Sequence, residues 1–307
     1  MEGSEGGALV FLLLTSLFLL PYSSFSLYLA FKSNRLMLKK NLALLLFLGF
    51  TAFLYGQSGP YLFSGAGYMS NGEIGILAED AEAAIVLPAL LAERDYGGWT
   101  VGASKRSGLS DYTEVAGAAH IKLPWKDQLA LGIQHVGIEG YAEQRISLSY
   151  ARRLFDKFNA GVTFDVNRNS AEEYDDLYAV SWAVSLHAPL MKQLSLGAYI
   201  YNPLGVESEL DLPSMIRADL LYTPSDKLNL ALEVEKDWRH DLRFKAGFNY
   251  RIHPRLAIRW GVSTSPSLVH AGLSWNILNN MSISGGWRYH SKLGSSLSAS
   301  LSQSKRK

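Results

Sequence analysis

The sequence predicts an all-β fold, a transmembrane antiparallel β-barrel of about fourteen strands with a short N-terminal helical plug-like segment. Two observations carry this prediction. From Gly98 onward, apolar side chains alternate with small or polar ones, and short polar turns recur along the chain. Because successive side chains of an extended strand point to opposite faces, such alternation indicates strands with one apolar and one polar face.

The N-terminal part of the chain carries a secretory signal pattern. Lys39 and Lys40 are followed by an apolar run that ends near Gly56. We therefore expect residues 37–56 to be a signal peptide. Residues 1–36 are expected to be an upstream start-site extension or, alternatively, a membrane anchor.

Residues 57–97 form the predicted plug-like segment between the signal and the first strand. Three carboxylates stand there immediately before an apolar stretch. Closely spaced carboxylates favour a helix N-terminus over a catalytic acid–base pair, so we expect them to cap a short helix inside the barrel. They are also expected to face basic lumen residues such as Arg243 and Arg259. The predicted plug residues are Glu79, Asp80, Glu82, Pro88 and Leu90.

Residues 98–302 form the predicted barrel. Short turns lie near residues 126, 156, 191, 226, 254 and 279, and mostly longer connections alternate with them. The strands between them have about nine to eleven residues, the length that a tilted strand needs to cross a bilayer. With export, this pattern indicates the outer membrane of a Gram-negative bacterium. A soluble secreted β-sandwich is the alternative, which the strongly apolar face disfavours. Residues 303–307 are expected to be a basic tail.

Aromatic residues cluster near both ends of the predicted strands, as they do at membrane interfaces. The membrane-interface aromatics predicted at the short-turn end are Trp125, Tyr150, Tyr222, Tyr250 and Trp275. Those predicted at the long-loop end are Tyr141, Tyr178, Tyr201, Trp287 and Tyr289.

Charged residues recur on the polar face of the later strands. The predicted lumen charges are Arg217, Glu233, Glu235, Arg243, Lys245, Arg259 and Arg288. Two interpretations are open. The lumen is either solvated and of mixed charge, or its basic side faces a fixed acidic partner inside the barrel, because buried charges need pairing.

The composition excludes several classes of site. The chain has 307 residues, a formal net charge of +1 and no cysteine, so disulfides, thiolate metal sites and cysteine nucleophiles are excluded. The charge gives no indication of a nucleic-acid partner. Its seven histidines show no metal-binding spacing, and no G-x-S-x-G motif occurs. The sequence therefore predicts a non-enzymatic protein without a cofactor or a metal site.

The stretch "GAGYMSNGEIGILAEDAEAAIVLPALLAE" resembles the N-terminal signature of the FadL-like outer-membrane barrels, particularly the PorV/PorQ group associated with type IX secretion. The residues that fall on the pattern are Gly72, Ala78, Asp80, Pro88, Ala89 and Leu90. The stretch "KLNLALEVEKDWRHDLRFKAGFNYRIHPRLAIRWGVST" is similar to the second half of these barrels. Leu87 stands where the family has Asn, so a ligand-gating role of that Asn is not carried over.

The resemblance implies a fourteen-stranded barrel with an N-terminal segment folded into or against its lumen. The expected function is that of an accessory or adaptor subunit in protein export or outer-membrane assembly, with outer-membrane lipids and a larger envelope or secretion complex as partners. The alternative is a FadL-like transporter of hydrophobic small molecules. A third possibility, an open porin, requires residues 57–97 to leave the lumen.

Overall fold

The computed structural model describes residues 65–106, 112–203, 210 and 212–304. All of them fall within one compact unit, Leu54–Lys307. The predicted signal peptide and the segment before it lie outside the described residues. Among the described helices, none has the length and apolar character needed to span a membrane.

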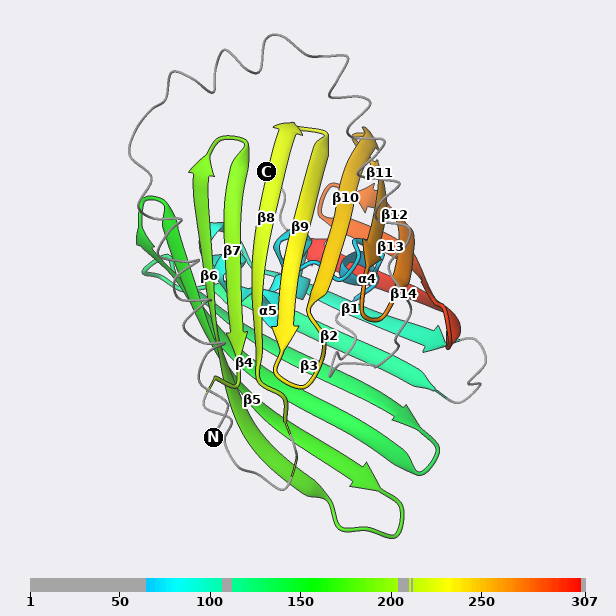
Figure 1. The fold of residues 1–307 in the computed structure, drawn as a ribbon. Helices are drawn as coiled ribbons and strands as arrows, with labels where there is room; N and C mark the ends of the chain where they lie inside the picture. The colour runs from blue at the N-terminus through cyan, green and yellow to red at the C-terminus, as the bar shows by residue number, and fades with distance from the viewer. Residues whose placement is uncertain (1–64, 107–111, 204–209, 211, 305–307) are drawn as a thin grey trace, which may run out of the picture. The chain divides into compact units, whose positions relative to one another are not determined.

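Fourteen antiparallel strands form a closed barrel in the part of the chain that the structure describes, which confirms the predicted fold (Figure 1). Each strand pairs with the next one along the chain, and the last strand pairs with the first. The strands are β1 (Gly98–Arg106), β2 (Thr113–Lys122), β3 (Gln128–Ile138), β4 (Tyr141–Phe155), β5 (Phe158–Ala171), β6 (Leu177–Met191), β7 (Leu194–Tyr201), β8 (Met215–Ser225), β9 (Leu228–Asp237), β10 (Arg243–His253), β11 (Leu256–Ser263), β12 (Leu268–Leu278), β13 (Met281–His290) and β14 (Gly294–Ser304).

The strand lengths depart from the expected nine to eleven residues. The longest strands, β4 and β6, have 15 residues each, and β5 has 14. Their extra residues include "YAEQR" and "NRNSA", which are polar on both faces but still pair, with Tyr141 opposite Ala171. The prediction was wrong here because alternation marks only the part of a strand that has one apolar face, whereas backbone pairing continues beyond it.

The two faces of the barrel differ as the alternation predicts. In β3, Leu131 and Ile133 are 47% and 51% exposed on the outer surface, whereas Ala130 and Gln134 are buried inside. An outer surface of large apolar side chains suits contact with lipid. Tyr201 was predicted at a membrane interface, and this is wrong. It shares the inward parity of Tyr199 in β7 and is only 2% exposed.

Five short elements of the N-terminal segment fill the lumen. They are α4 (Ala66–Ser70), η2 (Gly75–Leu77), η3 (Asp80–Glu82), α5 (Ala83–Val86) and η4 (Pro88–Glu93). We call residues 65–97 the plug. Its elements contact strands all around the barrel, and Met69, Ile74, Leu87 and Leu91 in it are among the largest fully buried side chains. The core of the molecule therefore lies between the plug and the barrel wall.

The predicted short helical segment is present in the plug, but it is not one continuous helix, because the backbone is interrupted at two places. Asp80 has a positive φ of 48°, which an L-residue rarely adopts within a helix. Leu87 has a φ of −156°, which lies outside the helical region. It precedes Pro88, and a residue before proline avoids the helical region because it would clash with the proline ring. Pro88 then begins η4. Proline is tolerated there because the first N–H of a helix forms no hydrogen bond within the helix.

Candidate functional site: the plugged lumen and its end cavities

Inward-facing glycines of β10 to β13 allow the plug backbone to approach the barrel wall closely. A Cβ atom at Gly261 would lie 2.4 Å from the Cα of Gly72, and one at Gly272 would lie 2.4 Å from the Cβ of Ser70. No side chain larger than hydrogen fits at such positions without displacing α4 or the residues that follow it. We call these residues the glycine seat. Its members are Gly247, Gly261, Gly272 and Gly286.

The glycine seat was not predicted from the sequence. A signal for it existed, because glycines with inward parity in the middle of strands often mark close approach of another backbone. The same holds on the opposite wall, where a Cβ at Gly132 would lie 2.7 Å from Ile85 and one at Gly161 would lie 2.7 Å from the backbone nitrogen of Ala89.

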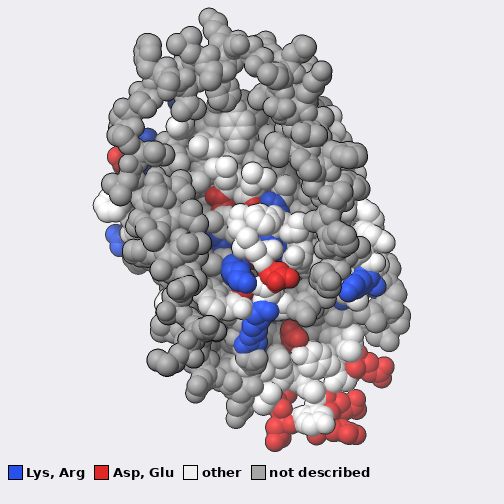
Figure 2. Space-filling view, in the orientation of Figure 1, with Lys and Arg blue, Asp and Glu red and all other residues white. Residues whose placement is uncertain are grey.

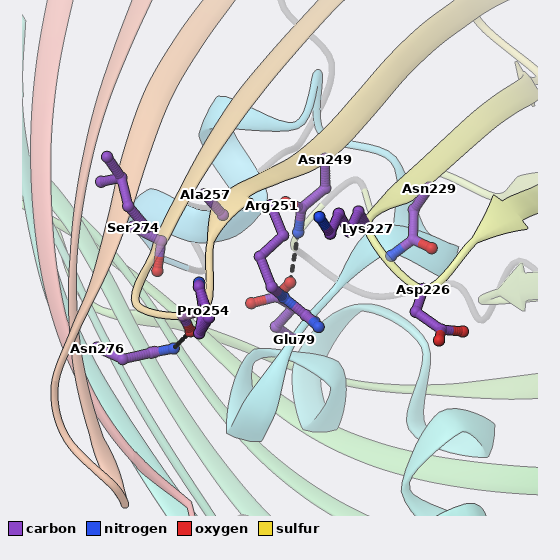
Figure 3. Close-up of a pocket in the computed structure, with 11 residues that line it drawn as sticks. Glu79, Asp226, Lys227, Asn229, Asn249, Arg251, Pro254, Ala257, Ser274 and Asn276 are labelled. Carbon is purple, nitrogen blue, oxygen red and sulfur yellow. Dashed lines mark hydrogen bonds between the residues drawn. The ribbon is translucent and has the colours of Figure 1, made fainter.

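The three predicted plug carboxylates do not cap a helix, since neither η3 nor α5 has a side-chain cap. Glu79 instead forms an ion pair with Arg259, with 2.7 Å between its Oε2 and an Arg259 terminal nitrogen. It also accepts a hydrogen bond from the side chain of Asn249 (Figure 3). Glu79 thus joins the plug to β10 and β11.

Glu82 is enclosed by the start of the plug. Its Oε1 accepts a hydrogen bond of 3.1 Å from the backbone N–H of Gly67, and its buried Oε2 has no hydrogen-bond partner. Burial raises the pKa of Glu82 to about 8, against the opposing effect of Arg259 and with the help of Asp80 and Glu79. A Cβ at Gly65, whose φ is +141°, would collide with this carboxyl group. The "GAG" sequence at 65–67 therefore leaves room for Glu82.

The other predicted plug residues lie as follows. Asp80 is buried, and its carbonyl oxygen accepts a hydrogen bond from Arg94. Leu90 is half-buried and packs against both apolar clusters of the plug. Arg243, a predicted partner of these carboxylates, is the first residue of β10. It lies 3.3 Å from Glu235 on the neighbouring strand and donates to the carbonyl oxygen of Ser265.

Glu73 is a further plug carboxylate, and its role was not predicted from the sequence. Its Oε1 lies 2.7 Å from a terminal nitrogen of Arg288, which also approaches Glu114 at 3.4 Å. Burial alone would raise the pKa of Glu73, but Arg288, His270 and Lys245 outweigh this effect and lower it to about 2. Glu73 is therefore ionised and holds the plug to β13.

Charged side chains of β8, β9 and β10 form a buried two-row ladder. The pairing register places Arg217, Glu235 and Arg243 in one row. Asp219, Glu233 and Lys245 form the other row. Lys245 lies 2.7 Å from Glu233 and 2.9 Å from Glu235.

The ladder is also connected to the plug through backbone groups. The N–H of Gly75 donates to Glu233 at 2.7 Å, and Lys245 donates to the carbonyl oxygen of Glu73 at 2.8 Å. Arg217 donates to the carbonyl oxygen of Val86. Five of the six charges are thus paired with each other or with the plug, whereas both carboxylate oxygens of the buried Asp219 have no hydrogen-bond partner.

A cavity of about 620 Å³ lies at the long-loop end of the barrel. Glu73 and Arg288 are among its lining residues, so the plug forms part of its wall. Arg145 donates from Nε to Asn167 at 2.9 Å and lies 5.1 Å from the ring of Tyr201. Arg106 lies 4.3 Å above the ring of Tyr112. The apolar lining residues include Val136, Ile138, Leu212, Leu268 and Leu293.

A smaller cavity of about 130 Å³ lies at the short-turn end. Its lining is polar and includes Glu79, Asp226, Lys227, Asn249 and Arg251 (Figure 3). The plug occupies the lumen between the two cavities. Among the described residues there is no group of His, Asp and Glu side chains that could hold a metal ion.

The predicted short-turn aromatics all lie on the outer surface. Their exposed fractions are 63% for Trp125, 36% for Tyr150, 44% for Tyr222, 39% for Tyr250 and 59% for Trp275. Their contact with a membrane interface stays a prediction.

No protein-family model and no curated protein sequence matches this chain. Solved structures do match. The toluene transporter TbuX of Ralstonia pickettii has a TM-score of 0.62 at 11% identity, over 80% of this chain and 98% of that chain. The toluene transporter TodX of Pseudomonas putida has a TM-score of 0.61 at 12% identity, over 83% and 99%. A Pseudomonas aeruginosa FadL homologue has a TM-score of 0.60 at 11% identity, over 81% and 99%. The chain therefore has the fold of the FadL-like outer-membrane barrels.

Proposed function

We propose that this protein takes up a small organic molecule with an apolar body and an anionic group across the outer membrane. The observation that carries this proposal is the cavity of about 620 Å³ at the long-loop end. Its volume falls within the range of small-molecule sites, and its lining combines apolar side chains with a few charged ones.

Two arginines suit the anionic group. Arg145 uses Nε for Asn167, and its terminal nitrogens have no hydrogen-bond acceptor among the described residues. Its guanidinium group and that of Arg106 are each held against an aromatic ring. Such a group is oriented in advance for a carboxylate or a similar anion.

The structural neighbours support uptake of a small molecule, because those with matching folds include toluene transporters and a monoaromatic hydrocarbon channel. A bare hydrocarbon would suit this cavity less well. It would displace water from Arg106 and Arg145 without replacing the lost hydrogen bonds. An acid with an apolar body satisfies both parts of the lining.

Binding of a matched pair of probes tests the proposal. The full chain is purified in detergent and titrated with 4-methylbenzoate and with p-xylene, which differ mainly in the carboxylate. We expect the acid to bind more tightly, and Arg145→Gln to weaken it about tenfold, since hydrogen bonds to charged groups are worth about 1.5–3 kcal/mol.

Arg168→Gln is the control, because Arg168 pairs with Asp176 and does not line the cavity. It should bind both probes as the wild type does. Equal loss of binding in the two variants, or no preference of the wild type for the acid, would refute the proposed ligand.

An accessory role of PorV/PorQ type in protein export is the second candidate. The observation that favours it is the number of ion pairs that fix the plug, among them Glu79–Arg259 and Glu73–Arg288. An adaptor needs a closed barrel and a partner rather than a moving plug. Pull-down in mild detergent should then return a large envelope complex, and a barrel that always purifies alone argues against this role.

A further inference from the structure

We propose that the short-turn end of β2 to β7 is a binding surface for the headgroups of anionic glycerophospholipids. We call this surface the basic rim. Its cations are Lys122, Lys126, Arg152, Arg153, Lys157 and Lys192, all exposed. The proposal does not depend on what passes through the lumen.

Three neighbouring short turns build the basic rim, those between β2 and β3, β4 and β5, and β6 and β7. Each turn places a lysine within two residues of a large exposed apolar side chain. The apolar side chains are Trp125 at 63%, Phe155 at 74% and Met191 at 69% exposure. A lysine beside an apolar anchor can extend its ammonium group to the headgroups while the anchor enters the acyl boundary.

The charge of the basic rim is poorly compensated by protein carboxylates. In the same turns and strand ends, the carboxylates are Asp127 and Asp156, and Glu93 of the plug contacts Asn159 and His187 at this end. Asp127 is buried, accepts a hydrogen bond from the hydroxyl of Tyr150 and lies 3.7 Å from Arg152. The remaining cations of the rim therefore attract phosphate groups, an effect of about 1 kcal/mol for each lysine near an anionic surface.

The opposite end of the same strands is acidic. Exposed or partly exposed carboxylates occupy the connections between β3 and β4 and between β5 and β6, and Figure 2 shows acidic side chains gathered there. These residues are Glu139, Glu172, Glu173, Asp175 and Asp176. The cations are thus concentrated at one end of these strands rather than spread over the surface.

The position of the cations favours a lipid over an acidic protein as the occupant. In β4, Leu148 and Tyr150 point to the apolar outer surface, and Arg152 and Leu154 continue the same exposed face beyond them. Cations on this face lie beside the hydrocarbon layer, which a soluble partner does not enter. The headgroups next to that layer are their direct neighbours.

Lipid retention tests the proposal. The full chain is equilibrated in nanodiscs of phosphatidylglycerol and phosphatidylcholine in equal parts, extracted in mild detergent, and the retained lipids are counted by mass spectrometry. We expect the wild type to retain phosphatidylglycerol severalfold in excess. Replacing three rim lysines, K126Q/K157Q/K192Q, should reduce the excess at least about fivefold, the factor that one such lysine contributes.

The matched control is K105Q/K236Q/K292Q, which removes the same charge from exposed positions at the long-loop end. It should keep the phosphatidylglycerol excess. The folded state of both variants is checked by heat-modified electrophoretic mobility. No excess in the wild type, or equal retention by the two variants, overturns the proposal. The probe-binding titration is done in detergent without phospholipid, so the two proposals can fail separately.

Discussion

At the scale of single residues, the structure assigns a specific task to each plug carboxylate. Glu79 and Glu73 form ion pairs with Arg259 and Arg288 of the barrel wall. Glu82 is different, because it is enclosed by the plug backbone and one of its oxygens has no hydrogen-bond partner. Composition and spacing mark such residues as charged, but they cannot say which of them a lumen will bury.

Glu82 makes the docked plug sensitive to pH. Its pKa is about 8 in the folded protein and near 4.5 when exposed, so the folded state binds more protons between these values. Its contribution to stability is therefore complete below about pH 4.5 and is lost as the pH rises through 8. We expect the unfolding temperature in detergent to fall by several degrees from pH 5 to pH 9.

Glu82→Gln should remove most of this fall, because the amide does not ionise. Glu172→Gln, at an exposed loop position, should leave the fall unchanged. If the Glu82→Gln variant loses as much stability between pH 5 and pH 9 as the wild type, ionisation of Glu82 is not the cause.

The Glu79–Arg259 pair should hold the plug through charge. Glu79→Lys places two cations within contact distance, so the buried guanidinium group of Arg259 loses its opposite charge and meets a like one. We expect single-channel conductance in planar bilayers to rise in this variant. The exchange Glu79→Arg with Arg259→Glu restores opposite charges and should lower the conductance again. A double variant that conducts more than the single one contradicts this pairing.

At the scale of elements, alternation was sufficient to predict the number and order of the strands, though not their full lengths, because a barrel strand must separate apolar from polar side chains at every second residue. The short turns near residues 126 and 156 lie where the sequence placed them. The path of the plug could not be predicted in the same way. Its five short elements follow the shape of the wall, in particular the glycine seat, and no periodicity of their own records that shape.

The glycine seat should be intolerant of side chains. Gly261→Val brings a Cβ to within 2.4 Å of the Cα of Gly72, so the backbone of Asn71 and Gly72, directly after α4, must move. We expect increased cleavage of the plug by protease in the inserted barrel. Gly285→Val in β13 is the control, because the nearest atom to a Cβ there is 4.0 Å away. Equal protection in both variants would show that α4 does not depend on the seat.

At the scale of the whole molecule, the plug separates the two cavities, so the proposed uptake requires the plug to move. The chain has no cysteine, which allows a single disulfide to be introduced cleanly. Ala89 and Ser185 are suitable positions, since the backbone nitrogen of Ala89 and the Oγ of Ser185 lie 3.0 Å apart.

With both residues replaced by cysteine, oxidation should lock η4 to β6. Opening of the lumen by movement of η4 away from β6 is then blocked. We therefore expect uptake of 4-methylbenzoate into proteoliposomes to fall at least about tenfold on oxidation and to recover on reduction. Each single-cysteine variant is the control and should respond to neither treatment. Uptake that persists in the oxidised double variant would show a path that leaves η4 in place.

The contact of α4 with the glycine seat also has a consequence for how the barrel assembles. Ser70 lies near the beginning of the described chain, and its partner Gly272 belongs to a strand close to the end. Joining β1 to β14 closes a loop of almost the whole barrel, and docking of α4 on the late strands closes a loop of similar length at an earlier step. Once α4 is docked, only the residues between α4 and β1 remain to be ordered when β1 meets β14. We infer that the plug guides closure of the ring, so that loss of the seat should slow insertion as well as loosen the finished protein.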